Sequence, residues 1–231
     1  MKIKVEIPNT INGIKLVNYQ KYNKIMKASP DANDEFLETK LLEIFCGVSY
    51  KDIIKMPLGT FDEATQHVHE IFKAKTPLIR RFTMTGSDGV EVEFGFIPNL
   101  DKMTMGEYID LNNYIEDTDM MHKAMAVLFR PIHSTFKDKE KYLISTYDGA
   151  AQYGEMMKDM PLGIALGARV FFYRLGMKLS RAILNSFQAL DLSEEGSLSE
   201  EEKKLLTANT AGIKNFMHLQ TEMLSNYKGL H

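Results

Sequence analysis

The fold is organised around residues 94–132, which read FGFIPNLDKMTMGEYIDLNNYIEDTDMMHKAMAVLFRPI. The phenylalanines and the isoleucine at the start favour a strand, and Pro98, which has no backbone N–H to donate, ends it. Thr104 can cap the first turn of a following helix while the side chain of Glu107 reaches back to the Thr104 N–H, so the two residues form a capping box. The predicted apolar face of this helix consists of Tyr108, Leu111 and Ile115.

A second helix follows within the same stretch. Asp117 or Thr118 can cap it. Its apolar residues recur at the i, i+4, i+7, i+8 spacing of a buried stripe. The predicted stripe consists of Met121, Met125, Leu128 and Phe129. Pro131 is expected to end this helix, because a proline disrupts the helical hydrogen bonds.

Three strings in this stretch resemble strings in largely uncharacterised proteins encoded among the virion genes of tailed bacteriophages. They are FIPNL (96–100), GEYIDL (106–111) and MHKAMAVLFRPI (121–132). The resemblance extends over residues 1–190 and is strongest here. Some of those proteins are described as tail or baseplate assembly chaperones, and others only as structural proteins. The resemblance therefore implies a setting in virion assembly, but it supplies no catalytic motif and no defined site residue.

The composition is that of an ordinary globular chain. Its 231 residues are 44% hydrophobic and 26% charged, enough to bury the core of one domain or of two small ones. The formal net charge is -3, which gives no overall attraction to nucleic acid or to anionic membranes. We therefore expect neither of them as a partner.

Cysteine and methionine usage adds two expectations. The single cysteine, Cys46, excludes an internal disulfide, and no apolar signal segment follows the charged start MKIKVEIP. Both features favour synthesis in a reducing cytosol. The chain has 15 methionines and no tryptophan. Methionine adapts to surfaces that must fit several partners, although filling irregular gaps in a core is its commoner role.

Before the central stretch, the patterns predict a strand and several helices. Residues 2–7 alternate polar and apolar, as a half-buried strand does. Helices are predicted over 17–26 and 34–45, and a capping box of Thr60 with Glu63 predicts the start of another. The expected buried residues of the 34–45 helix are Phe36, Leu37, Leu41, Ile44 and Phe45.

A hairpin is predicted to lead into the central stretch, and a short strand and two more helices are predicted after that stretch. Gly-Ser-Asp-Gly predicts the turn that joins strands over 81–85 and 90–97. A short strand is expected over 142–144 and a helix over 149–158. The longest apolar helix is predicted over 161–187. It begins at Pro161, because a proline is tolerated in the first turn of a helix.

Two short motifs occur twice in the same order. Ile-Pro-Asn at 7–9 returns at 97–99, and Met-Pro-Leu-Gly at 56–59 returns at 160–163. One hypothesis is an internal duplication of a unit made of a hairpin and helices. The alternative is that short proline turns before helices recur by chance.

These patterns predict an α+β protein that is mainly helical and has small antiparallel β-hairpins. We expect an N-terminal unit of hairpin and helices (1–78) and a second such unit (79–190). An acidic linker and a C-terminal helix complete the chain (191–231). The linker is rich in glutamate and serine between Asp191 and Glu202, which is typical of a solvated segment.

No catalytic, cofactor-binding or metal-binding residue is predicted. His67 and His69 are two apart on a helix and point about 200° apart, so they cannot share an ion there. Cys46 has no base arranged beside it in the sequence, and a buried structural thiol is the favoured interpretation. His122 and His133 are isolated and are interpreted as amphipathic or surface residues. The sequence has none of the motifs GxSxG, GxGxxG or HExxH, so we expect no enzyme.

Two sets of residues are candidates for binding a partner. In the long helix, Arg174, Lys178 and Arg181 lie in one sector, where they can meet an acidic partner, nucleic acid or the glutamate-rich linker. In the C-terminal segment over 211–227, a helical pattern predicts one apolar strip, which can lie in the groove of a partner or dock on the core of the chain itself. The strip consists of Phe216, Met217, Leu224 and Tyr227.

The expected function is non-enzymatic. With the resemblance taken into account, it is that of an assembly factor or chaperone for a phage tail or baseplate, which binds a virion protein and acts in the host cytoplasm. The alternative is a structural subunit of the neck, tail or baseplate, located in the virion. An unrelated small-molecule enzyme is a third hypothesis. Homo-oligomerisation stays open in each case.

Overall fold

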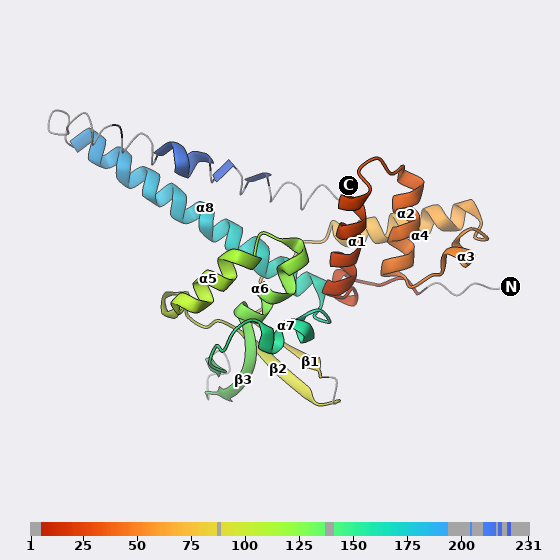
Figure 1. Ribbon diagram of the computed structural model, residues 1–231, viewed down its shortest axis with the longest axis horizontal. Helices are drawn as coiled ribbons and strands as arrows, with labels where there is room; N and C mark the ends of the chain where they lie inside the picture. The colour runs from red at the N-terminus through yellow and green to blue at the C-terminus, as the bar shows by residue number, and fades with distance from the viewer. Residues whose placement is uncertain are drawn as a thin grey trace. The chain divides into compact units, whose positions relative to one another are not determined.

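The computed structural model describes residues 6–86, 89–136 and 141–193, together with 204, 210–215, 217, 218, 221 and 222. Within these residues the fold is α+β, as the sequence predicts: helices predominate and accompany one small antiparallel sheet (Figure 1). By their contacts the residues group into two compact units, Met1–Ala168 and Arg169–His231. The boundaries at 78/79 and 190/191 stay a prediction, because contacts do not show which segments fold independently.

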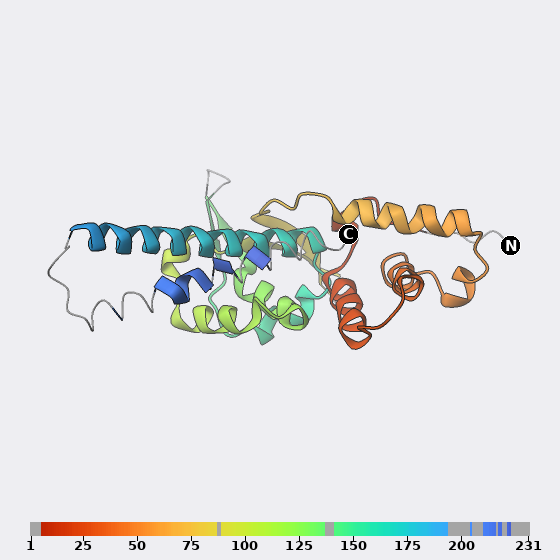
Figure 2. The same ribbon diagram turned by 90° about the horizontal axis from the view of Figure 1, so that it is seen from above.

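Four helices precede the sheet. They are α1 (Leu16–Ala28), α2 (Asp34–Phe45), α3 (Tyr50–Ile53) and α4 (Leu58–Phe72). Figures 1 and 2 show them gathered together, and α2 packs against the other three. Their interior is aromatic, since the ring of Phe45 lies 5.2 Å from that of Tyr22 and 5.3 Å from that of Phe72. Such ring pairs add stability beyond the apolar area that they bury.

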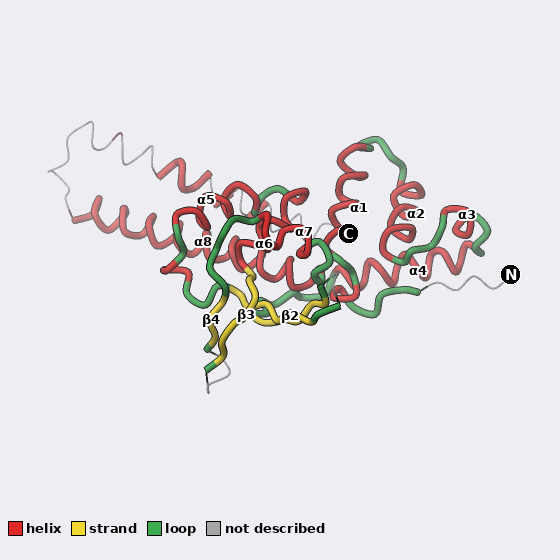
Figure 3. The backbone as a smooth tube through the Cα atoms, turned by 60° about the horizontal axis from the view of Figure 1, so that its bottom comes forward, coloured by secondary structure: helices red, strands yellow, loops and turns green. Residues whose placement is uncertain are grey.

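Four antiparallel strands form one sheet in the order β1-β2-β3-β4 (Figure 3). They are β1 (Arg81–Thr85), β2 (Glu91–Phe96), β3 (Phe129–Thr135) and β4 (Tyr142–Ile144). The predicted hairpin and the predicted short strand are thereby confirmed. Gly95 is required in β2, because a Cβ atom there would collide with the ring of Tyr142. The hydroxyl of Tyr142 donates to the carbonyl oxygen of Phe96 at 2.8 Å, which holds the ring in this place.

The remaining helices lie between and after the strands. They are α5 (Met105–Tyr114), α6 (Met121–Leu128), α7 (Ala151–Met157) and α8 (Leu162–Ser193). Three short 3-10 turns precede α1, α5 and α6, namely η1 (Ile11–Gly13), η2 (Leu100–Lys102) and η3 (Thr118–Met120). The boundary between the two units falls within α8, after Ala168.

The core of the first unit lies where α6 runs into β3. The rings of Phe94, Phe96 and Phe129 are fully buried, and the last two lie 5.3 Å apart. The predicted stripe on α6 is confirmed, because Met121, Met125 and Leu128 are fully buried as well. Complete burial of a side chain of this size contributes about 1.5–3 kcal/mol.

The start of α8 ties the N-terminal helices to this core. The N–H of Leu16 donates to the carbonyl oxygen of Met160 at 2.9 Å, and the N–H of Leu162 donates to that of Ile14 at 2.8 Å. Gly163 and Gly167 face Asn12 and Pro77 so closely that neither position has room for a Cβ atom. The two glycines of the Gly-xxx-Gly spacing therefore allow backbone segments of the first unit to approach each other.

Two predicted helix boundaries are wrong. No Thr60–Glu63 capping box forms, because α4 begins three residues earlier, after Pro57, whose φ of -56° already suits a helix start. Pro131 does not end α6, because the backbone is already extended at Phe129 (φ -120°, ψ 126°). Pro131 lies instead in β3, opposite Phe94.

Two side chains that were expected in the core lie on the surface. Phe36 is 39% exposed and Tyr108 is 55% exposed. Both come early in their helices, where none of the described elements covers the apolar face, while Leu111 and Ile115 further along the same face as Tyr108 are buried. Residues 2–5 of the strand predicted over 2–7 lie outside the described part of the chain, and residues 6–7 form no strand.

The element order agrees with the duplication hypothesis. After each Ile-Pro-Asn motif come a 3-10 turn, two helices and a short helix, and then Met-Pro-Leu-Gly opens a long helix. The later copy differs by η3, which lies between its two helices, and by β3 and β4, which lie between its second helix and its short helix. Duplication stays a prediction, because element order alone also permits a chance match.

Candidate protein-binding surfaces

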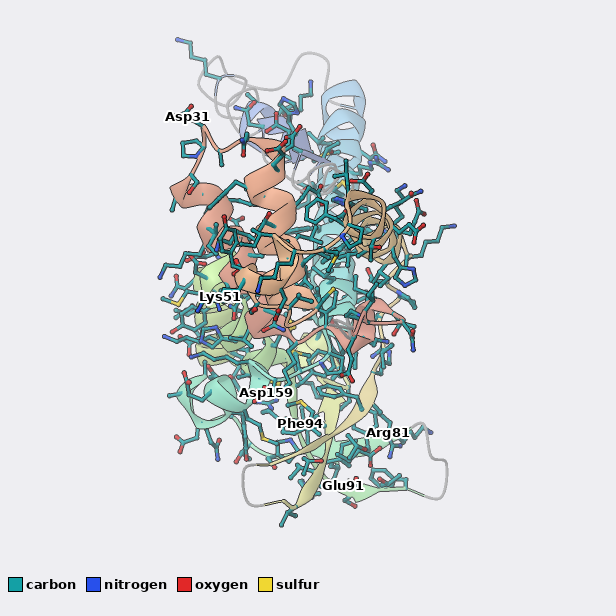
Figure 4. The ribbon with its side chains drawn as sticks, turned by 90° about the vertical axis from the view of Figure 1, so that its right-hand side faces the viewer. Asp31, Lys51, Arg81, Glu91, Phe94 and Asp159 are labelled. Atoms are coloured by element: carbon teal, nitrogen blue, oxygen red, sulfur yellow. The ribbon has the colours of Figure 1, made fainter. Side chains whose placement is uncertain are left out.

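The first candidate surface lies where α2, α3 and α4 begin. It presents four large apolar side chains to solvent, and we refer to it as the α2–α3–α4 surface. They are Phe36 (39% exposed), Tyr50 (55%), Ile54 (61%) and Leu58 (74%). Figure 4 shows this side of the first unit, with Lys51 of α3 and Asp31 of the α1–α2 connection labelled. Phe36 and Tyr50 line one groove together, and grouped exposed apolar residues, unlike single scattered ones, are typical of interaction sites.

Local capping explains why these side chains are presented. The side chain of Asn33 accepts the N–H of Phe36 at 3.0 Å and starts α2 there. The hydroxyl of Ser49 accepts the N–H of Asp52 at 3.3 Å and starts α3. Because α3 is only four residues long, Tyr50 at its start and Ile54 just beyond its end stand one helical turn apart.

Two grooves adjoin this surface. One has a volume of about 410 Å³ and is lined by Asn33, Glu35, Phe36, Thr39, Lys40 and Tyr50. The other, of about 380 Å³, is lined by Lys21, Ile25, Lys40, Glu43, Ile44, Gly47, Val48 and Ser49. Lys40 lines both: its ammonium group lies 5.7 Å from the ring centre of Phe36 and pairs with Glu43. The grooves therefore adjoin along α2 at Lys40.

A second apolar strip lies on α5. Met105 is 71% exposed, Tyr108 55% and Ile109 46%. They have the i, i+3, i+4 spacing that places side chains on one face of a helix. We refer to them as the α5 strip.

A buried ion pair fixes α5 against the sheet. Oε1 of Glu107 lies 2.5 Å from Nη1 of Arg130, the second residue of β3. The other carboxylate oxygen of Glu107 accepts the N–H of Thr104 at 2.6 Å, and the Thr104 hydroxyl accepts the N–H of Glu107. The predicted capping box is thereby confirmed. Burial alone would raise the pKa of Glu107, but the hydrogen bonds from Thr104 and the charge of Arg130 together lower it.

The cluster continues to the segment after β4. The guanidinium of Arg130 lies 5.6 Å from the ring centre of Tyr147, and the hydroxyl of Tyr147 donates to the carboxylate of Asp110. Burial first, and then the Asp110 carboxylate, raise the pKa of Tyr147. Both β3 and the segment after β4 therefore hold α5, although sequence reasoning assigned no role to Arg130. The available signal was a lone charge in the apolar run AVLFRPI.

His122 is buried, in contrast to the predicted amphipathic or surface position. It is 7% exposed, and its Nδ1 lies 3.0 Å from the side-chain amide of Gln20 on α1. Burial and then the charge of Lys158 lower its pKa. The same amide donates to the carbonyl oxygen of Thr118 at 2.8 Å. This contact joins α1 to the start of α6 and leaves no open position for a ligand on Nδ1.

The other titratable candidates are in structural contacts. His69 lies 2.7 Å from the carboxylate of Glu38 on α2, away from any ion site shared with His67. Cys46 is buried, and burial raises its pKa to about 11. Among the described residues no group of three His, Cys, Asp or Glu side chains is placed to hold a metal ion. The described helices likewise include none that is long and apolar enough to span a membrane.

The partner-binding residues predicted from the sequence fall in the second unit. Arg174, Lys178 and Arg181 are exposed on α8. In the tail, Met217 is half-buried and Thr221 donates to Sδ of Met177 at 3.7 Å, so the described tail residues run beside α8. Phe216, Leu224 and Tyr227 lie outside the residues whose side chains are described. The predicted tail strip therefore stays a prediction.

Comparison of the chain with protein-family models, with curated proteins and with solved structures found no match.

Proposed function

We propose that this chain is a non-enzymatic assembly factor that binds another protein through the α2–α3–α4 surface. The observation that supports the proposal is the exposure of Phe36, Tyr50, Ile54 and Leu58 beside two adjoining grooves. Transfer of apolar area from water contributes about 25 cal/mol per Å². A partner that covers these side chains removes their apolar area from water, and this burial stabilises the complex.

The partner we propose is a virion protein of a tailed bacteriophage. This part rests on the resemblance of residues 96–100, 106–111 and 121–132 to proteins of virion gene clusters. Those strings lie in η2, α5, α6 and β3, so they describe the core and the α5 strip and do not describe the α2–α3–α4 surface. The class of partner and the binding surface are therefore supported by separate observations.

The methionines contribute less to the binding surface than their number suggests. Met84, Met121, Met125, Met157 and Met160 all belong to the core. Among the described methionines, the exposed ones are Met105, at 71% exposure, and Met120, at 37%. Binding is therefore proposed to depend on aromatic and branched aliphatic side chains.

Affinity purification from phage-infected cells tests the proposal. The tagged chain should capture a protein that mass spectrometry also finds in purified particles. The double variant Tyr50→Ser with Ile54→Ser should lose this capture. The matched control is Phe136→Ser with Leu143→Ser, which removes one aromatic and one aliphatic side chain of similar exposure (52% and 46%) near β4. Equal capture by both double variants would contradict the proposal.

Proteomics of the same particles separates an assembly factor from a structural subunit. An assembly factor leaves before the particle is complete, so the chain should be absent from purified virions. Retention at a fixed stoichiometry would instead identify a subunit of the neck, tail or baseplate.

A further inference from the structure

The sheet ends on one side at β1, whose only strand neighbour among the described residues is β2 (Figure 1). At one end of this pair, the N–H of Phe96 donates to the carbonyl oxygen of Arg80 at 2.8 Å. At the other end, the N–H of Gly86 donates to the carbonyl oxygen of Val90. Residues that bond to the neighbouring strand alternate with residues that do not. Since the register is constant between these ends, the even-numbered residues of β1 bond to β2 and the odd-numbered ones direct their backbone groups away from it.

Two threonines present their backbone groups at this edge. The N–H and C=O groups of Thr83 and Thr85 point away from β2, and no described residue donates to or accepts from them. Both residues are exposed. A row of outward donors and acceptors is the template with which an added strand pairs. The chemistry of the edge therefore specifies an extended strand as its ligand.

The two edges of the sheet differ in how they are shielded. β4 is three residues long, and its register against β3 shifts between Ile132 and Ser134. Short or bulged edge strands resist the addition of another strand. β1 has five residues and contains no proline, lysine or bulge. Its one charged side chain, Arg81, bonds to the carboxylate of Glu93 on β2 at 2.9 Å and 3.0 Å. β1 therefore lacks the features that shield β4.

We infer that β1 pairs antiparallel with β1 of a second copy of this chain, so that the two sheets become one. With Thr83 on the twofold axis, it lies opposite Thr83 of the second copy, and Arg81 lies opposite Thr85 of that copy. The N–H and C=O groups of the two Thr83 residues then bond to each other, as those of opposed residues do in an antiparallel sheet. The inference does not depend on the proposed function.

The side chains of β1 match those of a second copy. Because Arg81 lies opposite a threonine, no like charges oppose each other, and threonine opposite threonine is a favourable cross-strand pair. On the other face of the sheet, the half-buried ring of Phe82 comes next to Met84 of the second copy. The apolar layer on this face therefore continues from one copy into the other. A strand of a different protein would satisfy the same backbone groups, and the experiment below separates the two occupants.

Sedimentation velocity of the full chain tests the inference. Five residues per strand bury a small area, so we expect a weak dimer with a Kd of about 1–100 µM, as interfaces below about 1,200 Å² have. Thr83→Pro should be monomeric throughout this range, because proline removes the outward N–H while the bonds of β1 to β2 stay. The matched control is Thr83→Val, which keeps the N–H and the branched shape and should dimerise as the wild type does.

Cysteine cross-linking gives a second measurement if Thr83→Pro does not fold. The Cα atoms of opposed, hydrogen-bonded residues lie about 5.5 Å apart, which is within reach of a disulfide. Thr83→Cys should therefore form a disulfide-linked dimer on oxidation. Leu143→Cys, at an exposed position of β4, should stay monomeric. The native Cys46 is buried and does not compete.

A wild type that stays monomeric up to about 100 µM would overturn the inference, as would a folded Thr83→Pro variant that dimerises normally. Equal cross-linking through Thr83→Cys and Leu143→Cys would overturn it too. Loss of virion-protein capture by Thr83→Pro, in a chain that is monomeric without this change, would assign the edge to a strand of that protein instead. Loss of the dimer with capture unchanged would support the inference and leave the proposed function standing.

Discussion

The guanidinium of Arg130 lies 2.5 Å from the carboxylate of Glu107, and their side chains are only 7% and 5% exposed. The pair joins the second residue of β3 to the first turn of α5. Removal of one member of a buried pair leaves an unpaired charge, whereas removal of both often costs little. The position of α5, and of the α5 strip that it carries, should therefore depend on both residues being present together.

Replacement of Glu107 alone should be strongly destabilising. We expect Glu107→Ala to lower the free energy of unfolding by about 3–5 kcal/mol, because Arg130 stays buried without its partner. The double variant Glu107→Leu with Arg130→Met should lose much less. Urea denaturation of the wild type, the single variants Glu107→Leu and Arg130→Met, and the double variant measures the coupling, and additive losses would show that the pair does not act as a unit.

The same pair predicts a pH dependence. Because the pKa of Glu107 is lowered in the folded state, its contribution is fully present above the unfolded value of about 4.3 and is lost as pH falls through the folded value. Melting temperatures of the wild type and of Glu107→Gln should therefore differ most near neutral pH and converge in acid. A difference that stays constant down to pH about 3 would contradict the assigned role.

Gly95 should tolerate no side chain. A methyl group there would meet the ring of Tyr142 and, at 2.9 Å, Cγ1 of Ile132. We expect Gly95→Ala to destabilise the protein by about 1–3 kcal/mol, as overpacking does. The control is Gly106→Ala in α5, where the added methyl group meets nothing within 4 Å and where alanine favours the helix by about 1 kcal/mol. Thermal melts should therefore move in opposite directions for the two variants.

Cys46 should react slowly in the native protein. Burial raises its pKa to about 11, so little thiolate forms at pH about 8, where a free thiol reacts readily. Labelling with iodoacetamide should be slow without denaturant and fast in urea. Fast labelling of the native protein, with circular dichroism unchanged, would show that the thiol is accessible and ionised.

Local signals in the sequence predict most helices and strands of this fold. They do not predict which distant residues contact each other. Thr104 and Glu107 are three residues apart, so their capping box is visible in the sequence. The partner of Glu107 is Arg130, which comes from a strand 23 residues later (130 - 107 = 23). No periodicity connects two such positions, and only the folded chain shows that both are buried.

The exposed side chains of the proposed α2–α3–α4 surface were missed for a related reason. Helical spacing predicts Phe36 on the buried face of α2, but spacing cannot show how far along the helix the neighbouring elements extend. Tyr50 begins a helix of only four residues and Ile54 directly follows it, and so short a helix displays no period. Exposure of these side chains follows from the lengths and ends of three helices together.

The affinity of the purified chain for the captured virion protein tests the central claim most directly. Titration calorimetry with Tyr50→Ser plus Ile54→Ser should show a Kd about thirtyfold to nearly a thousandfold above that of the wild type, since two central contacts cost about 1–2 kcal/mol each. The Phe136→Ser plus Leu143→Ser control should bind as the wild type does, and circular dichroism should show both double variants folded. A folded Tyr50/Ile54 variant that binds with unchanged Kd would contradict the assignment of the α2–α3–α4 surface.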